Sequence, residues 1–589
     1  MCSVFLILTG LLFLRPTASA ASPLNSVDAG SGNHGAESLL IHTDRDLYIA
    51  GENLYFQLYL VPSQQNQAPS RIAYILLQRI TNENIETFIV RLSDHIAFGS
   101  IYLHDTLPTG NYRLLCFTNR MRRYEGNNYI TKPIFIVNRF DETLEKISTA
   151  RQDIDDQMQE EFQDKRDHGS QNNKVKISTN RTTFGRRDQV DLSIEPKDFA
   201  DSIAYLSVSV AQDKSYVFPD HAFSGRQVLN RQPGSIYQNK SRPGEVFAET
   251  RHLILEGMVR DKNTGIGLEG LRVLLSTPDS LLNLQYAQTL DDGSFYFAIN
   301  DFYLNKPLYL ILDTSTMNSP ALIEVADRFA TKGPEKHEQP VFSAGHDEFI
   351  AASQEYVSIQ KVYEINHQSK YSDLIKNKEF RPLVYAEPNY TVYPEMYEPL
   401  RDFREISREL IGQLRTRLSG GTYTTRMLNY QTAYQFFEDA PAIFLDAIPV
   451  SDIHQIMHLG TEKVKSIEVH NYRWAYGEMR FAGIMAVFSR NEAWRLLELP
   501  ESSKVLEGMS FLEPSLYYDP DYSQATNTQA TIPDLRQLLA WRPGIRLTSG
   551  ENLLIRFHTG DIKGKYLIRL VGVTAGGEMF STVSEITVE

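Results

Sequence analysis

The chain has 589 residues, of which 42% are hydrophobic and 22% charged, and its formal net charge is −14. This composition is that of ordinary globular proteins, and the length exceeds what one hydrophobic core supports, so we expect about three to five domains. The acidic balance argues against a nucleic-acid-binding protein, because neutralising phosphates requires clustered Lys and Arg.

Residues 1–20 have the pattern of a secretory signal peptide. An apolar core at residues 4–14 is followed by the Ala-x-Ala cleavage site Ala18-Ser19-Ala20. The usual positive charge before the core is missing. A membrane anchor is the alternative, although the run is too short to span a bilayer. No later apolar run is long enough to span a membrane, so we expect no transmembrane segment after signal cleavage.

Cysteine usage predicts a fold without disulfides. Cleavage would remove Cys2 and leave Cys116 alone in the chain, so no internal disulfide could form. Cys116 lies within a predicted strand, and we expect its thiol to be buried.

Residues 38–140 contain short apolar and aromatic runs separated by turn residues. Runs at about ten-residue spacing predict an antiparallel β-sandwich. Gly and Asn between the runs supply positive φ angles at little steric cost. The predicted strands are residues 47–49, 54–60, 73–79, 85–92, 96–103 and 112–118.

Three phrases of this region, HTDRDLYIAGENLYFQLYL, DTLPTGNYRLLCFTNRM and ITKPIFIVN, resemble the macroglobulin-type β-sandwich of exported Bacteroidetes proteins. In that family an extended strand carries a Tyr-x-x-Gly-Glu phrase, which here is Tyr48, Gly51 and Glu52. The resemblance implies fold rather than activity, because function within the family is diverse. The thioester-forming Cys-x-Glu-Gln of the large macroglobulin traps is absent, since Cys116 is followed by Phe-Thr-Asn.

The next two regions are predicted to be a linker and a second sandwich. Residues 141–173 are polar and charged, which favours a tether between domains over an acidic interaction segment. Residues 174–250 return to strands, and Thr183-Phe184-Gly185 with the strand after it echoes the turn-and-strand pattern of the first sandwich. We therefore predict a second macroglobulin-like sandwich, with a long insertion over residues 214–250.

Residues 251–330 resemble the carboxypeptidase-regulatory-like β-sandwich, in which a Gly-x-Val-x-Asp strand leads to an Asp-Gly-x-Phe hairpin. Asp261 with Asn263 and Gly265 is a weak calcium pattern. It falls short of a twelve-residue loop closed by Glu, so a plain loop is favoured. The residues that carry the resemblance are Gly257, Val259, Asp261, Asp292, Gly293 and Phe295.

A helix is predicted over residues 403–418, ended by Gly420-Gly421. Its apolar stripe is assigned to the core in preference to a partner groove. His454 and His458 lie four apart on a short predicted helix, where they could share a metal ion, but a pair without metal is favoured. The stripe consists of Ile406, Leu410, Ile411 and Leu414.

Residues 441–489, within a predicted α+β domain at 400–500, resemble the plug domain of TonB-dependent outer-membrane receptors. Ala447 stands where Gly is usual, and no barrel is expected after Arg490. The resemblance therefore implies a plug-like docking or scaffold unit. Its candidate interaction loop, residues 472–481, contains Trp474, Tyr476 and Gly477. The matching phrases are Phe444-Leu445-Asp446, Ile448-Pro449, Ser466-Ile467-Glu468-Val469, Tyr476-Gly477 and Gly483-Ile484.

Residues 530–589 are predicted to form a C-terminal β-domain. The segment 560–565 lacks the spacing of a phosphate-binding loop, and we interpret it as a hairpin turn. The phrases around Asp534 and residues 557–561 again resemble exported Bacteroidetes multidomain proteins.

The predicted fold is thus mainly β, with several tandem antiparallel β-sandwiches of immunoglobulin or macroglobulin type and a small α+β plug-like domain. There is no His-Glu-x-x-His zinc helix and no Gly-x-Ser-x-Gly nucleophile elbow. We therefore predict no catalytic, cofactor-binding or metal-binding residues.

Three hypotheses for function follow. The first is a non-enzymatic accessory or scaffold protein of the cell envelope. It would be exported to the periplasm or outer membrane and would bind an outer-membrane barrel protein or receptor complex. The second is a secreted or periplasmic module that binds a peptide or glycan. The third is a hydrolase with a dispersed active site, which no motif supports.

Overall fold

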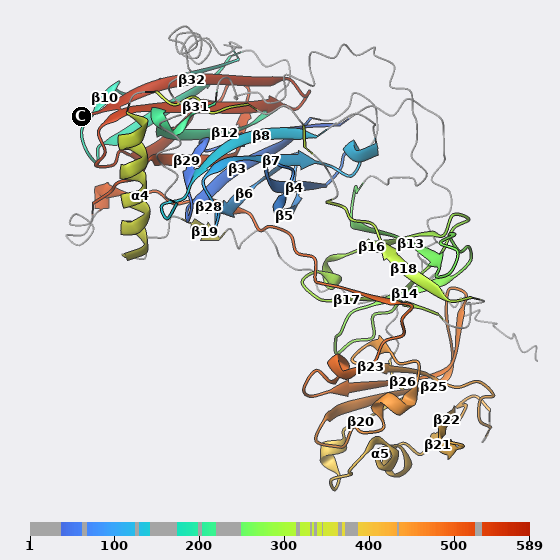
Figure 1. The fold of residues 1–589 in the computed structure, drawn as a ribbon. Coiled ribbons are helices and arrows are strands. Elements are labelled where there is room, and N and C mark those ends of the chain that lie inside the picture. Colours follow the sequence, from blue (N-terminus) through green and yellow to red (C-terminus); the bar gives the residue numbers. More distant parts are fainter. Residues whose placement is uncertain are drawn as a thin grey trace, which may run out of the picture. The chain divides into compact units, whose positions relative to one another are not determined.

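The structure is a computed structural model of the chain, and it is mainly β (Figure 1). It divides into two compact units. The larger unit comprises Gly35–Pro278, Leu284–Pro382 and Leu499–Glu589, and the smaller includes Asp279–Asn283 and Leu383–Glu498. The described residues are 37–61, 68–123, 129–141, 174–197, 203–218, 249–313, 319–329, 333–334, 338–343, 345–362, 368–370, 387–432, 435–524 and 533–589. The predicted signal peptide and most of the predicted linker and of the 214–250 insertion lie outside them.

In the larger unit, the first sandwich confirms the strands predicted from the apolar runs. Its two sheets have the orders β1-β3-β6 and β2-β8-β7-β4-β5, antiparallel except where β2 runs parallel to β8. Cys116 is buried in β7, as predicted, and burial raises the pKa of its thiol. The strands are β1 (Ser38–Thr43), β2 (Leu47–Ile49), β3 (Asn53–Val61), β4 (Ile72–Arg79), β5 (Asn84–Arg91), β6 (Ile96–Tyr102), β7 (Gly110–Phe117) and β8 (Ile130–Val137).

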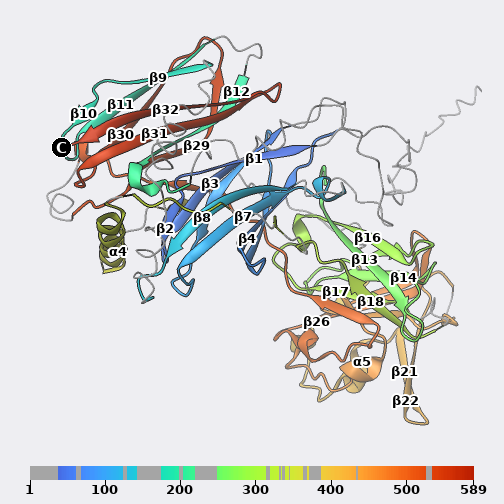
Figure 2. The ribbon, with the colours of Figure 1, turned by 45° about the horizontal axis from the view of Figure 1, so that its top comes forward.

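The second sandwich is built from two segments that are far apart in sequence. β12 pairs with both β29 and β31, so the regions predicted as separate domains at 174–250 and 530–589 form one sandwich (Figures 1 and 2). Its sheets have the orders β9-β11-β30 and β10-β32-β31-β12-β29. The strands are β9 (Val175–Thr179), β10 (Thr183–Phe184), β11 (Gln189–Pro196), β12 (Ile203–Gln212), β29 (Leu538–Thr548), β30 (Leu553–His558), β31 (Gly564–Thr574) and β32 (Met579–Val588).

The two sandwiches have the same topology, strand for strand. The first four strands, β1–β4, correspond in order to β9–β12, and the last four, β5–β8, correspond to β29–β32. With this correspondence the strand orders of the two sheets are the same in both sandwiches. The short second strand runs parallel to the last strand in both. In the first sandwich residues 80–83 join the fourth and fifth strands, whereas in the second, residues 213–537 do so. The third sandwich and the smaller unit are therefore insertions into one strand connection.

One predicted turn has a different role from the one expected. The sequence predicts a hairpin turn at residues 560–565, but β30 and β31 belong to different sheets. The segment is instead a crossover between the two sheets of the second sandwich. A hairpin turn and a crossover between sheets have the same local sequence pattern, because the local sequence does not specify which sheet a strand joins.

The third sandwich has the sheets β16-β13-β18 and β15-β14-β17-β27. Its motif residues act through packing. Gly257 lies opposite Phe295, and a Cβ at Gly257 would be 2.3 Å from that ring. The Asp261 carboxylate accepts hydrogen bonds from two backbone N–H groups of its own loop, which agrees with the plain loop. The strands are β13 (Leu253–Asp261), β14 (Arg272–Ser276), β15 (Gln285–Gln288), β16 (Ser294–Ile299), β17 (Leu308–Leu312), β18 (Ala321–Val325) and β27 (Ser503–Leu506).

Strand β27 lies outside the range 251–330 predicted for this domain, because the chain returns to it only after the smaller unit. The larger unit also contains helix α4 (His346–Val362) and the antiparallel pair β19 (Gln368–Lys370) and β28 (Ser515–Tyr517). No helix among the residues that the structure describes is long and apolar enough to cross a membrane.

The smaller unit has one sheet, of order β20-β25-β26-β23-β24, and a separate two-stranded ribbon, β21-β22. The helix predicted over 403–418 ends at Leu410, and a strand begins at Leu414. Ile406, Ile411 and Leu414 are buried as expected, and Leu410 is partly buried. The elements are β20 (Tyr390–Val392), α5 (Phe403–Leu410), β21 (Leu414–Ser419), β22 (Thr422–Met427), β23 (Ala442–Leu445), β24 (Ile448–Pro449), β25 (Val464–Tyr476) and β26 (Met479–Ser489).

Candidate functional site

The predicted interaction loop, residues 472–481, is a β-hairpin in the smaller unit. Tyr476 pairs with Met479, which leaves Gly477, at a φ of 58°, and one further residue as the turn. The neighbouring strands β20 and β23 pair with β25 and β26 only up to Val469 and from Ile484 onward. The end of this hairpin, which we call the aromatic arm (residues 472–483), therefore extends beyond the described sheet as two strands.

Three aromatic rings stack on one face of the aromatic arm. The ring centroid of Trp474 lies 6.2 Å from that of Tyr476, with an interplanar angle of 12°. It lies 5.7 Å from the centroid of Phe481, which is its direct cross-strand partner. All three side chains are partly exposed. Cross-strand aromatic pairs stabilise a ribbon by about 0.2–1 kcal/mol, so the arm holds its rings in a defined arrangement while leaving part of each accessible.

The smaller unit exposes many large apolar side chains for its size. It contributes six of the fifteen such side chains among the described residues, although the larger unit has most of the chain. Exposed aromatic and Met side chains are enriched where proteins bind other proteins. The six are Tyr393, Met396, Tyr397, Leu418, Tyr430 and Leu496.

The turn that resembles the plug motif is held by a buried carboxylate. Asp446 and Ala447 join β23 to β24 with φ angles of 48° and 68°, both in the left-handed region that favours Gly. The Asp446 carboxylate accepts hydrogen bonds from Ser489 N and Oγ, each at 2.7 Å. Burial raises the pKa of Asp446, although these hydrogen bonds oppose the shift. Asp446 thus connects the turn to the end of β26.

The two histidines do not share the short helix on which they were predicted to lie. A 3-10 helix covers Ile453–Ile456 and ends before His458, so the spacing of an α-helix does not apply. The His454 ring lies against Tyr423, with 5.6 Å between centroids. Within the described part of the chain, no group of three or more His, Cys, Asp and Glu side chains could hold a metal ion.

In the larger unit, the Tyr-x-x-Gly-Glu phrase forms a buried polar cluster. The Tyr48 hydroxyl donates to the Asp44 carboxylate at 2.8 Å, and Arg45 pairs with Glu52 at 3.2 Å. Gly51 has a φ of 100°, which explains the Gly of the motif. Burial raises the pKa of Asp44 to about 6, and the nearby Arg45 opposes this shift. The phrase therefore stabilises the strand connection rather than exposing a reactive group.

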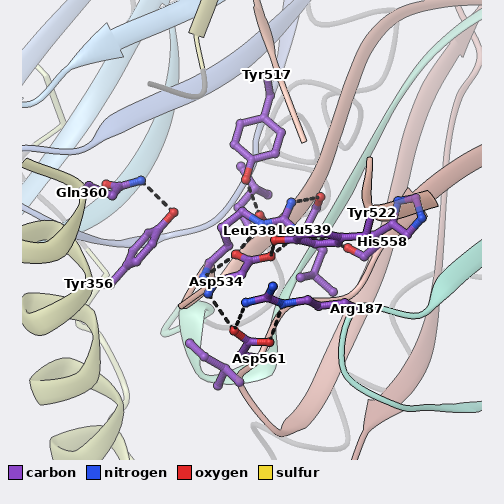
Figure 3. A network of polar contacts seen from close by, with 12 residues as sticks. Arg187, Tyr356, Gln360, Tyr517, Tyr522, Asp534, Leu538, Leu539, His558 and Asp561 are labelled. Carbon is purple, nitrogen blue, oxygen red and sulfur yellow. Dashed lines mark hydrogen bonds and ion pairs between the residues drawn. The ribbon is translucent and has the colours of Figure 1, made fainter. Parts of the chain in front are cut away.

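A second polar network was not expected from the sequence (Figure 3). Arg536 donates to both oxygens of Asp534, at 2.7 and 2.8 Å. Arg187 donates to both oxygens of Asp561, at 2.9 and 2.7 Å. Burial opposes ionisation of Asp561, but the ion pair with Arg187 lowers the pKa of this carboxyl overall. Tyr522 also donates to Asp534, at 2.8 Å.

This network connects the two segments of the second sandwich. Arg187 comes from the N-terminal segment, whereas Asp534 and Asp561 come from the C-terminal one. The carboxylates are matched by guanidinium groups, so their role is structural. The sequence did single out the phrase around Asp534 and residues 557–561, which contains one half of this network. The other half, near residue 187, could not be recognised without the fold.

An open cavity of about 620 Å³ lies in the larger unit between the first sandwich, α4 and β28. Several of its walls are tyrosine rings. Its buried cations are already paired, Arg45 with Glu52 and Arg536 with Asp534. The lining includes Arg45, Glu52, Tyr55, Tyr102, Tyr356 and Tyr517.

No protein-family model matches the chain. No curated protein matches it either. Among solved structures, a mutant alpha-2-macroglobulin of Salmonella matches at 9% identity and a TM-score of 0.24, over 95% of this chain and 40% of that one. Escherichia coli alpha-2-macroglobulin activated by porcine elastase matches at 9% identity and a TM-score of 0.24, over 94% and 44%. A tetra-tandem repeat from the extending region of a large adhesion protein matches at 9% identity and a TM-score of 0.14, over 94% and 100%.

This chain therefore spans less than half the length of those two macroglobulins.

Proposed function

We propose that the protein is an exported, non-enzymatic accessory or scaffold protein of the cell envelope, and that its smaller unit docks onto an outer-membrane barrel protein or receptor complex. The observation that supports this most directly is the partly exposed stack of Trp474, Tyr476 and Phe481 on the aromatic arm. Trp and Tyr side chains that become buried at an interface often supply most of its binding energy.

The connectivity of the chain supports the same function. The third sandwich and the smaller unit are inserted into one strand connection of the second sandwich. Binding surfaces are commonly carried on the connections of a rigid β scaffold. The sandwiches serve as the scaffold, and the inserted unit serves as the binding part.

The test is a double variant, Trp474→Ala with Tyr476→Ala, in the full chain. Tagged protein is mixed with detergent-solubilised envelopes of the source organism, and co-purified barrel protein is quantified. We expect recovery to fall by about tenfold or more, because each aromatic anchor contributes about 1–2 kcal/mol. The far-UV circular dichroism and Tm should stay close to those of the wild type, since both rings are partly exposed.

The matched control is Tyr102→Ala with Tyr518→Ala, two aromatic residues of the larger unit that are 41% and 58% exposed. It should recover the barrel protein as the wild type does. Unchanged recovery with the Trp474 and Tyr476 variant would rule out the arm as the docking surface. If that variant instead unfolds, the single variant Tyr476→Ala leaves the cross-strand pair of Trp474 and Phe481 in place, and it should fold and still lower the recovery.

A second candidate function is a peptide- or glycan-binding module, and the tyrosine-lined cavity of the larger unit favours it. Flat aromatic walls with polar hydroxyl groups suit such ligands. A peptide or glycan that raises Tm in proportion to its concentration would support this function. Tyr356→Ala with Tyr517→Ala should then abolish the rise in Tm, while leaving co-purification of a barrel protein unchanged.

A further inference from the structure

The ribbon β21-β22 of the smaller unit presents three arginines on one face. Arg415 and Arg417 are two residues apart on β21, and Arg426 on β22 is the direct cross-strand partner of Arg415. All three side chains are exposed. The opposite face carries Leu414 and Met427, which are buried. We call Arg415, Arg417 and Arg426 the arginine face.

The charges of the arginine face are not compensated within the described structure. None of the three guanidinium groups forms an ion pair or hydrogen bond with another described residue. Some other arginines of the same unit are paired, since Arg401 pairs with Glu405, at 2.7 Å. The same holds for Arg408, Arg490 and Arg495, each of which pairs with a Glu.

Placing Arg415 directly opposite Arg426 is unfavourable for folding, because like charges across a strand pair repel. The ribbon is held in spite of this repulsion by Leu414 and Met427, which pack in the hydrophobic core of the smaller unit. Arg415 is also held in place, with its guanidinium carbon 4.5 Å from the centre of the Phe436 ring. A stacked guanidinium keeps its N–H edges available for a carboxylate.

We propose that the arginine face binds an extended acidic segment of a partner protein. The Cα atoms of Arg415 and Arg417 are about 6.8 Å apart, as in any strand. This spacing matches alternate side chains of an extended chain, so Asp or Glu at every second position can meet successive guanidinium groups. Both edges of the ribbon lack a further strand among the described elements, which allows such a segment to lie alongside it (Figure 2).

The protein partner is favoured over nucleic acid and over a membrane by the charge of the chain. The net charge of −14 repels phosphate-rich surfaces, whereas a short acidic segment contacts only the ribbon. The inference goes beyond the proposed function, because it concerns a different ribbon and a different chemistry from those of the aromatic arm.

The test measures binding of a fluorescein-labelled peptide of about twelve residues with alternating Glu and Thr, long enough to cover one strand. Fluorescence anisotropy with the full chain should show binding that weakens as salt is added. The triple variant Arg415→Gln, Arg417→Gln and Arg426→Gln should bind about tenfold more weakly. The control Arg401→Gln, Arg408→Gln and Arg495→Gln changes the net charge equally and should bind as the wild type does.

A single variant separates binding from folding. Arg426→Thr removes the cross-strand repulsion, so Tm should rise by about 1–3 °C while peptide binding weakens about threefold. Equal binding by the wild type and the triple variant would overturn the proposal, as would an equal loss in the control. The protein-partner assignment would also fail if the wild type bound duplex DNA or phosphatidylglycerol vesicles but not the peptide. Trp474→Ala with Tyr476→Ala should leave peptide binding intact, so the two proposals can fail separately.

Discussion

Tyr112 and Tyr566 occupy equivalent positions in the first and second sandwiches, and each hydroxyl donates a hydrogen bond to the backbone carbonyl four residues upstream. The distances are 2.7 Å to the carbonyl of Pro108 and 3.0 Å to that of Ile562. The two tyrosines lie in β7 and β31, which are matched strands of the common topology. In each case the bond ties a crossover between sheets to the strand that follows it.

This equivalence predicts equal effects of removing either hydroxyl. We expect Tyr112→Phe and Tyr566→Phe each to lower the free energy of unfolding by about 1 kcal/mol, because a carbonyl of the crossover loses its donor. Urea denaturation followed by circular dichroism measures the change. Tyr393→Phe, at a side chain 47% exposed, is the control and should change stability by less than about 0.5 kcal/mol. A loss in one sandwich alone would contradict the equivalence.

Glu249 predicts a pH dependence of stability. It is buried and accepts hydrogen bonds at 2.8 Å from the Tyr74 hydroxyl and from Ile254 N. Burial raises the pKa of Glu249 from 4.5 to about 7, against the effect of these hydrogen bonds. The folded protein therefore holds the proton on Glu249 more tightly than the unfolded chain does. The stability that this proton contributes is fully present below the pKa of Glu249 in the unfolded chain, and it is lost as pH rises through the pKa in the folded protein.

The variant Glu249→Gln removes this titration. Relative to the wild type, it should gain about 1–3 kcal/mol in free energy of unfolding between about pH 4 and pH 8. Urea denaturation at a series of pH values measures the difference between the two proteins. The exposed control Glu507→Gln should follow the wild-type profile. Parallel profiles for wild type and Glu249→Gln would show that Glu249 does not change its protonation in this range.

Gly257 predicts a steric effect in the third sandwich. In Gly257→Ala the new Cβ would lie 2.3 Å from the Phe295 ring and 2.8 Å from the Glu324 carbonyl oxygen. We expect Gly257→Ala to lower the free energy of unfolding by about 1–3 kcal/mol, which thermal unfolding measures. Adding Phe295→Leu to the Gly257→Ala variant should restore part of the lost stability. Gly412→Ala, where a Cβ would meet no atom within 4 Å, is the control. A Gly257→Ala variant as stable as the control would contradict this account of the motif.

Local sequence determined the identity of many elements. The aromatic and aliphatic runs around residues 47–60 form the predicted strands, and Cys116 is buried within a strand as expected. Gly257 and Phe295, which both belong to the motif of the third sandwich, pair across its strands. These features depend on alternation, turn residues and side-chain size within about ten residues, which the sequence displays directly.

The candidate sites are only partly recognisable from the sequence. The residue types of Trp474 and Tyr476 indicate an interaction surface, but the expected loop is a strand pair that stacks their rings. The arginine face could not be recognised from the sequence, because the pattern of residues 403–418 predicts one helix. Leu414, Thr416 and Leu418 alternate with arginines at the spacing of a strand, yet Leu414 also fits a helical stripe. Such short segments are ambiguous until their packing decides.

By itself the sequence determined the strands, the turns and the burial of single side chains, because these depend on neighbours along the chain. Only the tertiary structure decided which strands pair. β12 joins β29 and β31 across residues 213–537, and β17 takes β27 as its last partner. Arg187 likewise meets Asp561 only through this pairing. The edge of an unpaired strand presents the same N–H and C=O groups to every strand that could pair with it. The partner strand is therefore selected by the shape and burial of side chains over the whole sandwich.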